Sequence, residues 1–417
     1  MEVRAGWWRA TAAIAVAVFL AATWFVNRPP WSTGVQVSDV PDYQVYGDAM
    51  ESGEVPYRDF RPEYPPLALA PFLLPSLVAD DGDVAAYERA FVWLMRLVGV
   101  ATVVLVALAL RILGRTRFET AAALGLVALS PLLLGRVMLQ RYDLLPALLL
   151  AAALTAFLAA RRRLAFAALA LATAAKVYPV LALPVLIAVA WRRHGRADTL
   201  AGLGVFAAVL AAVVVPFLAI APDGVWDAFA RQSTRPLQIE SLGAATLLAL
   251  HQIAGLELES VRSFGSQNLE GALPDAVAAV TVVLLVAVLA AVWLGLARGG
   301  LSRERLVLAV AASVTAFVAL GKVLSPQFLI WLVPLVALVG ARRGVVAGAL
   351  LVCALLLTQA YFPRRYYSLE EFSAVPSWLV LGRDLVLVGL LAALVAPGRG
   401  TYSRYRNTGP GSRSASR

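Results

Sequence analysis

The stretch WWRATAAIAVAVFLAATWFV, residues 7–26, is an apolar run of the length that crosses a lipid bilayer. A helix of about 20 residues covers the ~30 Å of a hydrocarbon core. Arg4 and Arg9 lie at the start of this run, and cationic flanks resist translocation across the membrane. The run lacks a small-residue cleavage site. We therefore predict a retained membrane span with a cytoplasmic N-terminus rather than a signal peptide.

The composition of the whole chain has the same character as this run. Of 417 residues, 60% are hydrophobic and 15% are charged, whereas an ordinary soluble domain has about 25% charged residues. The mean hydropathy is +0.77, and so little polar surface excludes a soluble protein of this size. A single cysteine, Cys353, excludes a disulfide framework and a cysteine-based zinc or iron–sulfur site. The net charge of +10 comes from basic residues between apolar runs, so we expect no nucleic-acid partner.

Basic residues between the apolar runs set the expected topology, because cytoplasmic loops collect Arg and Lys. The run 164–191 has basic residues at both ends and a break at Lys176 and Pro179 in its middle. A helix breaker beside a charge predicts two short arms, 164–175 and 177–191, with Lys176 near an outer turn. Both termini are then cytoplasmic. The twelve predicted crossing segments are 7–26, 91–113, 120–135, 144–160, 164–175, 177–191, 199–221, 274–297, 306–321, 326–341, 344–362 and 378–396.

These segments predict an all-α polytopic protein of the plasma membrane with about 10–12 transmembrane segments. Residues 1–396 are expected to form one membrane domain with outer loops 27–90 and 222–273. Residues 67–79 are apolar but short for a span, so an interfacial or re-entrant helix is expected there. Residues 397–417 are rich in Gly, Ser and Arg and predict a disordered basic cytoplasmic tail. No segment has the pattern of a β-strand.

Polar residues that the membrane does not explain collect in the loops expected outside. The first outer loop is acidic, with seven Asp and Glu residues between positions 36 and 63. Four further clusters interrupt the apolar runs, and they are Gln140–Asp143, Lys176–Pro179, Arg231–Ser241 and Lys322–Gln327. The sequence therefore predicts a functional site on the extracytoplasmic face.

Each cluster also has a purely structural explanation. An acidic outer loop is often only a solvated face, Arg141 and Asp143 are spaced for a local ion pair, and a lysine beside a helix end often reaches the headgroups. The lysines weigh against this explanation, because only Lys176 and Lys322 among 36 basic residues are lysines, and both lie in outer breaks. A compact cation that donates in any direction suits a phosphate. Together with Arg141, they are the candidates for binding a phosphate.

One carboxylate and several cations suit sugar transfer from a lipid-linked phosphosugar. A phosphate leaves as a stable anion without a general acid, and Lys or Arg offset its growing charge. One carboxylate accepts the proton of the acceptor hydroxyl, and in-line attack inverts the anomeric carbon. A glycosidase needs two carboxylates instead. The sequence has no metal-ligand spacing, so no metal or other cofactor is expected, although a divalent cation at the acidic loop stays open.

Several motifs resemble those of glycosyltransferase family 87, a family of GT-C membrane enzymes that use polyprenyl-phosphate sugars. In chain order they are Asp42–Ala49 with Gly53 and Pro56-Tyr57, Glu63–Leu67, Arg141–Asp143, Lys176–Pro179, Gln238–Ser241 and Lys322–Gln327. The first loop and the two lysine turns are also similar to the eukaryotic mannosyltransferases that begin the glycosylphosphatidylinositol anchor. The resemblance implies a GT-C fold, a polyprenyl-phosphate sugar as donor and Asp42 as catalytic residue. The anchor enzymes have Asp-x-Asp before the tyrosine, whereas this chain has one more residue between Asp39 and Asp42, so only Asp42 matches.

We therefore expect a membrane hexosyl- or pentosyltransferase in which Asp42 is the catalytic residue. It moves mannose, or as second choice arabinofuranose, from a polyprenyl-phosphate donor to a lipid or cell-envelope glycan hydroxyl on the outer face, with inversion. Candidate donor-phosphate ligands are Lys176, Lys322 and Arg141, candidate acidic helpers are Asp39 and Asp48, and candidate substrate contacts are Tyr43, Tyr64, Glu63, Tyr178, Arg231, Gln238 and Gln327. A transporter or lipid flippase is the alternative, although transporters place polar residues at mid-membrane between repeated halves. A membrane scaffold, the third alternative, predicts that no single outer residue matters.

Overall fold

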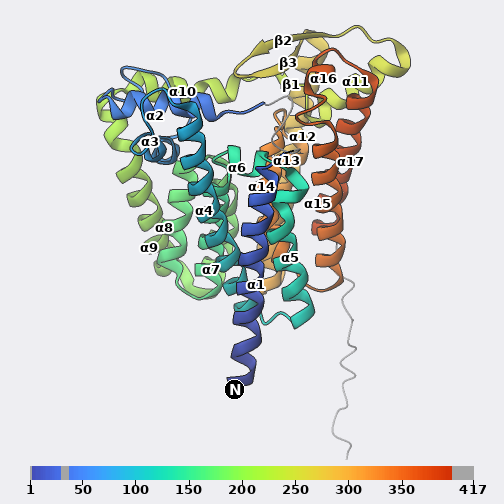
Figure 1. Cartoon of the computed structure of the whole chain (residues 1–417). Helices are drawn as coiled ribbons and strands as arrows, with labels where there is room; N and C mark the ends of the chain where they lie inside the picture. The colour runs from blue at the N-terminus through green and yellow to red at the C-terminus, as the bar shows by residue number, and fades with distance from the viewer. Residues whose placement is uncertain (1, 30–36, 397–417) are drawn as a thin grey trace, which may run out of the picture.

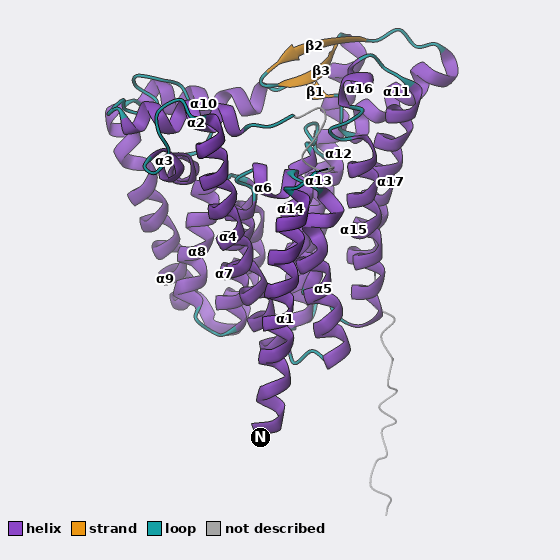
Figure 2. Cartoon of the chain, viewed as in Figure 1, coloured by secondary structure: helices purple, strands orange, loops and turns teal. Residues whose placement is uncertain are grey.

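Most of the chain is helical, and its helices run side by side between two unlike ends (Figures 1 and 2). The structure is a computed structural model and describes residues 2–29 and 37–396, so the predicted tail 397–417 lies outside the described residues. One end, here called the sheet end, carries α2 (Val40–Glu51), α10 (Pro222–Thr234) and a small sheet. α1 (Glu2–Val26) begins and α17 (Ala374–Val395) ends at the opposite end.

Seven helices among the described residues are long and apolar enough to cross a membrane. Each of the twelve segments predicted to cross contains a helix, but four of these helices are too short or too polar to be among the seven. α9 (Leu183–Ile220) covers two predicted segments, because Gly195 breaks it with φ 83° and ψ 178°, a conformation that only glycine adopts readily. The long helices not yet named are α4 (Val84–Leu113), α5 (Arg117–Leu134), α12 (Ala272–Arg298) and α15 (Ala341–Tyr361).

The four shorter helices pack inside the bundle, where they need not match the thickness of a bilayer. All nine residues of α14 (Leu329–Ala337) are buried, as expected of a helix that is apolar on every side. α7 (Leu144–Leu158) packs against α4, and α8 (Arg162–Ala175) packs against α7 and α9. α13 (Arg303–Leu320) packs against α12 and α17. These four helices therefore contribute a large part of the buried core.

Local sequence explains where several helices stop. α8 ends just before Lys176, and η2 (Tyr178–Ala182) then leads into α9, so the two arms predicted on either side of this lysine are present. Between α4 and α5, Gly114 takes the left-handed conformation with φ 70°. Thr116 and Glu119 form a capping box, in which each side chain accepts a hydrogen bond from the backbone of the other.

The helix predicted to be interfacial or re-entrant, 67–79, is a short helix at the sheet end. It consists of η1 (Pro66–Leu69) and α3 (Ala70–Ser76), and it packs against α2 and α4. A side chain at Gly47 of α2 would place its Cβ 2.4 Å from the carbonyl oxygen of Phe72, so this close approach requires glycine. The remaining short helices are α6 (Val137–Gln140), α11 (Leu242–Ala254), η3 (Pro326–Phe328) and α16 (Tyr366–Glu370).

The prediction that the chain has no strands is wrong for the loop 222–273. β1 (Leu237–Gln238), β2 (Glu259–Ser263) and β3 (Ser266–Glu270) form an antiparallel sheet in the order β1-β3-β2, which lies across the sheet end (Figure 2). A two-residue turn joins β2 to β3, and both of its residues have positive φ, as tight hairpins prefer. The strands are short and mostly polar, so they lack the apolar alternation by which a strand is recognised in sequence.

Candidate functional site

Asp42 lies in the first turn of α2 with its side chain exposed at the sheet end. The helix starts after Asp39, and Pro41 suits its first turn because proline has no N–H to be left unpaired. The start of a helix carries partial positive charge, which favours a carboxylate there. Asp42 is therefore placed where an ionised, accessible carboxylate is stable.

The charges around Asp42 oppose one another. Loss of part of its hydration raises the pKa of Asp42 above its ordinary value, and the negative charges of Asp39 and Glu63 add to this. The positive charges of Arg141 and Arg262 act in the other direction and lower the pKa. A carboxylate with a raised pKa is a stronger proton acceptor than an ordinary one. Two cations beside it keep the ionised form accessible.

Arg141 is held by Asp39 and not by Asp143. Its side chain is 4% exposed, and its Nη1 lies 2.9 Å from Asp39 Oδ1. Arg141 Nη2 also donates to the carbonyl oxygen of Val37 at 3.2 Å, and the hydroxyl of Tyr43 donates to Asp39 Oδ2 at 3.3 Å. The local ion pair between Arg141 and Asp143, the structural alternative that the sequence left open, is therefore not formed.

Lys176, whose side chain is 19% exposed, forms an ion pair with a buried carboxylate and does not reach outward to headgroups. Its Nζ lies 2.6 Å from Asp143 Oδ1, and Asp143 is 1% exposed. Trp331 Nε1 donates to the same oxygen at 2.7 Å. The rings of Tyr142 and Trp331 lie under the ammonium group, with centroids 4.8 and 5.0 Å away, and Tyr178 stacks on Trp331 at 3.9 Å. Two of the predicted site residues, Lys176 and Tyr178, therefore lie in one cluster with Asp143, Tyr142 and Trp331, here called the Lys176 cluster.

A layer of aromatic rings lies between the Lys176 cluster and α2, the helix that carries Asp42. Tyr43, the residue after Asp42, stacks on Phe72 with centroids 4.2 Å apart, and Tyr142 meets the edges of both Tyr43 and Tyr64. Tyr43 is 1% exposed and packs α2 against Phe72 of α3. Tyr64 is only half-buried and is the member of this layer that is open to a ligand.

Asp48 does not join the charges around Asp42. Its Oδ1 accepts a hydrogen bond from Ser76 Oγ at 2.7 Å, and its Oδ2 accepts one from the backbone N–H of Gly82 at 3.4 Å. Both oxygens therefore hold α2 against α3 and the turn that follows. Of the two predicted acidic helpers, Asp39 is the one beside Asp42.

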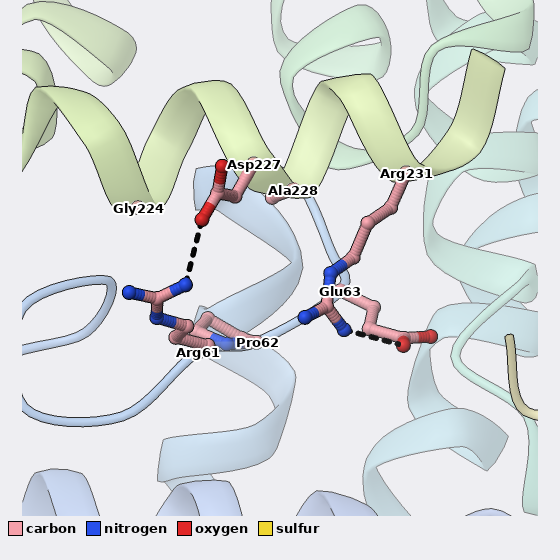
Figure 3. A pocket seen from close by; sticks show the side chains of 7 residues that line it. All are labelled: Arg61, Pro62, Glu63, Gly224, Asp227, Ala228 and Arg231. Atoms are coloured by element: carbon pink, nitrogen blue, oxygen red, sulfur yellow. Dashed lines mark hydrogen bonds and ion pairs between the residues drawn. The ribbon is translucent and has the colours of Figure 1, made fainter. Parts of the chain in front are cut away.

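Helix α10 lies against the first loop at a small pocket (Figure 3). Arg231 Nη1 lies 3.7 Å from Glu63 Oε1 across this pocket, and Arg61 pairs with Asp227 at 2.7 Å. The residues that line the pocket are Arg61, Pro62, Glu63, Gly224, Asp227, Ala228 and Arg231. Two ion pairs thus connect the first loop to α10, and the partners Arg61 and Asp227 are 166 positions apart in sequence.

The turn that contains Lys322 lies beside β1. The backbone N–H of Gln238 donates to the carbonyl oxygen of Lys322 at 3.0 Å, and Gln238 Nε2 donates to Ser325 Oγ at 3.1 Å. Gln238 is buried, so this predicted substrate contact holds the turn instead. Gln327 is half-buried in η3, directly after the turn.

Lys322 has a second cation near it. Partial burial lowers the pKa of Lys322, and the charge of Arg235 lowers it further, whereas Asp275 raises it. Arg235 is itself held in place, because it donates to the carbonyl oxygen of Phe264 at 3.1 Å and to Ser266 Oγ at 2.9 Å. Two partly dehydrated cations in one place favour an anion between them.

Two functional candidates were missed in the sequence. Arg235 belongs to the polar cluster Arg231–Ser241, so its charge is visible in the sequence. Its closeness to Lys322 is visible only in the structure. Arg262 comes from β2, a strand with no apolar pattern to reveal it. Within residues 2–29 and 37–396, no group of three or more His, Cys, Asp and Glu side chains is arranged to hold a metal ion.

Comparisons with known proteins identify the family. The solved structure of ArnT from Cupriavidus metallidurans bound to undecaprenyl phosphate is similar at 15% sequence identity and a TM-score of 0.49, over 94% of this chain and 78% of that chain. This likeness is too distant to carry a residue role. No curated protein matches the chain. The model of glycosyltransferase family 87 matches residues 63–326, more than half of the chain, a range that includes Lys176 and Lys322 but begins after Asp42. The chain therefore belongs to glycosyltransferase family 87 and is a membrane glycosyltransferase.

Proposed function

We propose that this glycosyltransferase moves mannose, or else arabinofuranose, from a polyprenyl phosphate to a hydroxyl of a lipid or cell-envelope glycan. One observation carries the proposal. An exposed carboxylate, Asp42, and a partly buried pair of cations, Lys322 and Arg235, share one end of a bundle of membrane helices. The negative charge of Glu63 raises the pKa of both Asp42 and Arg235, so it links the two parts of the proposed site electrostatically.

Asp42 acts as the base in this mechanism. It accepts the proton of the acceptor hydroxyl while the hydroxyl oxygen bonds to the anomeric carbon from the side opposite the phosphate. The bond between that carbon and the phosphate oxygen breaks, and polyprenyl phosphate leaves as an anion. The configuration at the anomeric carbon is inverted. No general acid is needed, because the leaving group is stable without a proton.

Lys322 and Arg235 hold the phosphate and stabilise its growing charge. Both cations are partly accessible at the sheet end, whereas the side chain of Arg141 is 4% exposed and Lys176 packs on the rings of Tyr142 and Trp331. The pairs of Lys176 with Asp143 and of Arg141 with Asp39 keep the aromatic layer and α2 in place. Glu63 and Tyr64 line the approach to Asp42 and are the proposed acceptor contacts.

We propose that the sheet end faces the outside of the plasma membrane. The loops at the opposite end are basic, and positive loops stay in the cytoplasm. This orientation puts both termini in the cytoplasm. It also puts the reaction on the side where lipid-linked sugars, and not nucleotide sugars, are the donors. The basic residues of those loops are Arg111, Arg115, Arg117, Arg161, Arg162, Arg163, Arg192, Arg193, Arg196, Arg298, Arg303, Arg305, Arg342 and Arg343.

The first test is Asp42→Asn, which removes the base but keeps its size. We expect transfer of labelled mannose from polyprenyl-phosphate mannose to membrane lipid to fall by at least about a hundredfold, the usual contribution of a positioned base. Expression and thermal unfolding should not change, since the side chain is exposed.

The matched control is Glu51→Gln, a second exposed carboxylate on the same helix, which should keep full activity. A parallel assay with polyprenyl-phosphate arabinofuranose decides the sugar. Wild-type transfer rates in Asp42→Asn would remove this residue from the mechanism, and no transfer by the wild type from either donor would contradict the proposed function.

A further inference from the structure

A buried polar network lies behind the turn that carries Lys322. Its members are Glu240, which is 2% exposed, and Tyr361, Arg383 and Asp384, which are fully buried. Tyr361 belongs to α15 and the other two belong to α17. Charged groups are buried at a large cost unless they are paired and hydrogen-bonded, so a network of this kind needs a reason.

One side of the network anchors Glu240 to two long helices. The hydroxyl of Tyr361 donates to Glu240 Oε1 at 2.6 Å, and Arg383 Nη2 donates to the carbonyl oxygen of Glu240 at 2.6 Å. Arg383 Nη1 also donates to the Tyr361 hydroxyl at 3.2 Å, and its Nε lies 2.6 Å from Asp384 Oδ1. Both the side chain and the backbone of Glu240 are therefore fixed to the bundle.

The other side of Glu240 leads to the turn. Its Oε2 accepts a hydrogen bond from Gln238 Nε2 at 3.4 Å, and the same nitrogen donates to Ser325 Oγ at 3.1 Å. The backbone N–H of Gln238 donates to the carbonyl oxygen of Lys322 at 3.0 Å. A continuous chain of contacts thus runs from α17 through Glu240 and Gln238 to the backbone of Lys322.

We propose that Glu240 is a positioning residue for the donor phosphate, which acts by holding Gln238 and the turn 322–325 so that Lys322 is placed at the phosphate. This inference rests on the proposed function of Lys322. Glu240 itself is too deeply buried to touch a substrate. A lysine side chain has four rotatable bonds, and its ammonium group is well placed only when its backbone is held.

The surroundings of Glu240 make glutamine an informative replacement. Burial raises the pKa of Glu240 to about 7, the charges of Arg383 and Arg141 and the hydrogen bond from Tyr361 lower it, and the charge of Glu370 raises it. Ionised, the carboxylate accepts from both of its partners. Glu240→Gln keeps the shape and one acceptor, but turns an amide N–H₂ toward one of the two donors.

The test compares Glu240→Gln and Tyr361→Phe in the full-length protein. We expect Glu240→Gln to raise the KM for the polyprenyl-phosphate sugar roughly tenfold, the effect of losing one hydrogen bond to a charged group, while the acceptor KM stays the same. Tyr361→Phe removes only the hydroxyl and should raise the donor KM by a few-fold. The control, Glu304→Gln, changes a carboxylate that pairs with Arg115 near the opposite end of the bundle and should change neither KM.

A double variant separates positioning from a general structural role. If Glu240 acts through Lys322, Glu240→Gln added to Lys322→Met should not raise the donor KM further, because coupled residues are not additive. Multiplying effects in the double variant would overturn the inference. If Glu240→Gln fails to fold, Tyr361→Phe and its double variant with Lys322→Met decide in the same way.

Binding of decaprenyl monophosphate to the protein in lipid nanodiscs gives a readout without catalysis. Weaker binding by Glu240→Gln, in step with its donor KM, supports the inference. If the wild type neither binds this lipid nor transfers sugar, the proposed function fails and the inference fails with it. If the wild type does both and Lys322→Met impairs binding, wild-type binding by Glu240→Gln and Tyr361→Phe overturns the inference alone.

Discussion

Asp42 and Asp143 are the same residue type in opposite surroundings, and this decides what each can do. Asp42 is exposed and lies among mixed charges, so it can meet a hydroxyl and take its proton. Asp143 is 1% exposed, and one of its oxygens already accepts from both Lys176 and Trp331. Asp143 therefore holds Lys176 and Trp331 in place, and its burial keeps it from reaching a substrate hydroxyl.

Arg262 should tune the proton affinity of Asp42. Its positive charge lowers the pKa of Asp42, so Arg262→Gln should raise that pKa. Because the base works only when it is deprotonated, the acidic limb of the kcat/KM profile should move to higher pH. The measurement is a pH–rate profile of both proteins. Arg58→Gln, an exposed arginine that pairs with its neighbour Asp59, should leave the profile in place, and so would Arg262→Gln if the two charges do not interact.

The two lysines should respond differently to the same replacement. Lys322→Met should raise the donor KM roughly tenfold with little change in Tm, because it removes a cation from the phosphate site. Lys176→Met leaves Asp143 buried without its partner, which costs about 3–5 kcal/mol and lowers the Tm by several degrees. Steady-state kinetics and thermal unfolding of both variants test this contrast. A raised donor KM in Lys176→Met at an unchanged Tm would return Lys176 to the phosphate site.

At the scale of elements, the position of α10 depends on close contact with the first loop. A Cβ at Gly224 would lie 1.9 Å from the carbonyl oxygen of Tyr57, so at this point the backbones of the helix and the loop are in direct contact. The ion pair between Arg61 and Asp227 lies beside this contact. Arg235 directly follows α10. The docking of α10 against the first loop therefore affects where Arg235 lies relative to Asp42.

Gly224→Ala should therefore push α10 away from the first loop. We expect a loss of about 1–3 kcal/mol in stability, typical of an added methyl group without space, and a fall in transfer activity. Thermal unfolding and the transfer assay measure both effects. The matched control is Gly204→Ala in the helix before α10, where nothing lies within 4 Å of the added Cβ and alanine should be neutral or stabilising. Equal behaviour of the two variants would show that the contact at Tyr57 does not matter.

At the scale of the whole molecule, the helices form a polytopic bundle of the GT-C type implied by the family, with a folded cap at one end. The sheet end carries the three charged groups assigned to the proposed reaction, which are Asp42, Arg235 and Lys322. Three charged groups at one end suit a reaction at a membrane surface, whereas transporters bind their substrates near the middle of the bilayer.

The proposed orientation predicts which residues are reached from outside the cell. Val177 is 45% exposed in the turn beside Lys176, and His194 is exposed at the far end of the first half of α9. In a Cys353→Ser background, Val177→Cys should react with an impermeant thiol reagent on intact cells, and His194→Cys should react only after permeabilisation. The opposite labelling pattern would place the sheet end in the cytoplasm.

The fold was largely predictable because hydropathy and flanking charge are local properties of the chain. A helix lies in each of the twelve predicted segments, and the break at Lys176 is visible as a charge followed by a proline. The short strands β2 and β3 were missed, since their pairing partners, and not their own residues, make them strands. The short buried helices were predicted as spans because apolar runs look alike inside a bundle and inside a membrane.

The sequence by itself determined that this protein spans a membrane and where the helices of its bundle lie. Only the tertiary structure decided which charges pair. Lys176 and Asp143 are 33 positions apart, and Arg383 reaches Glu240 across 143 positions. An ion pair is set by distance in space and by loss of water around it, and a linear pattern contains neither quantity.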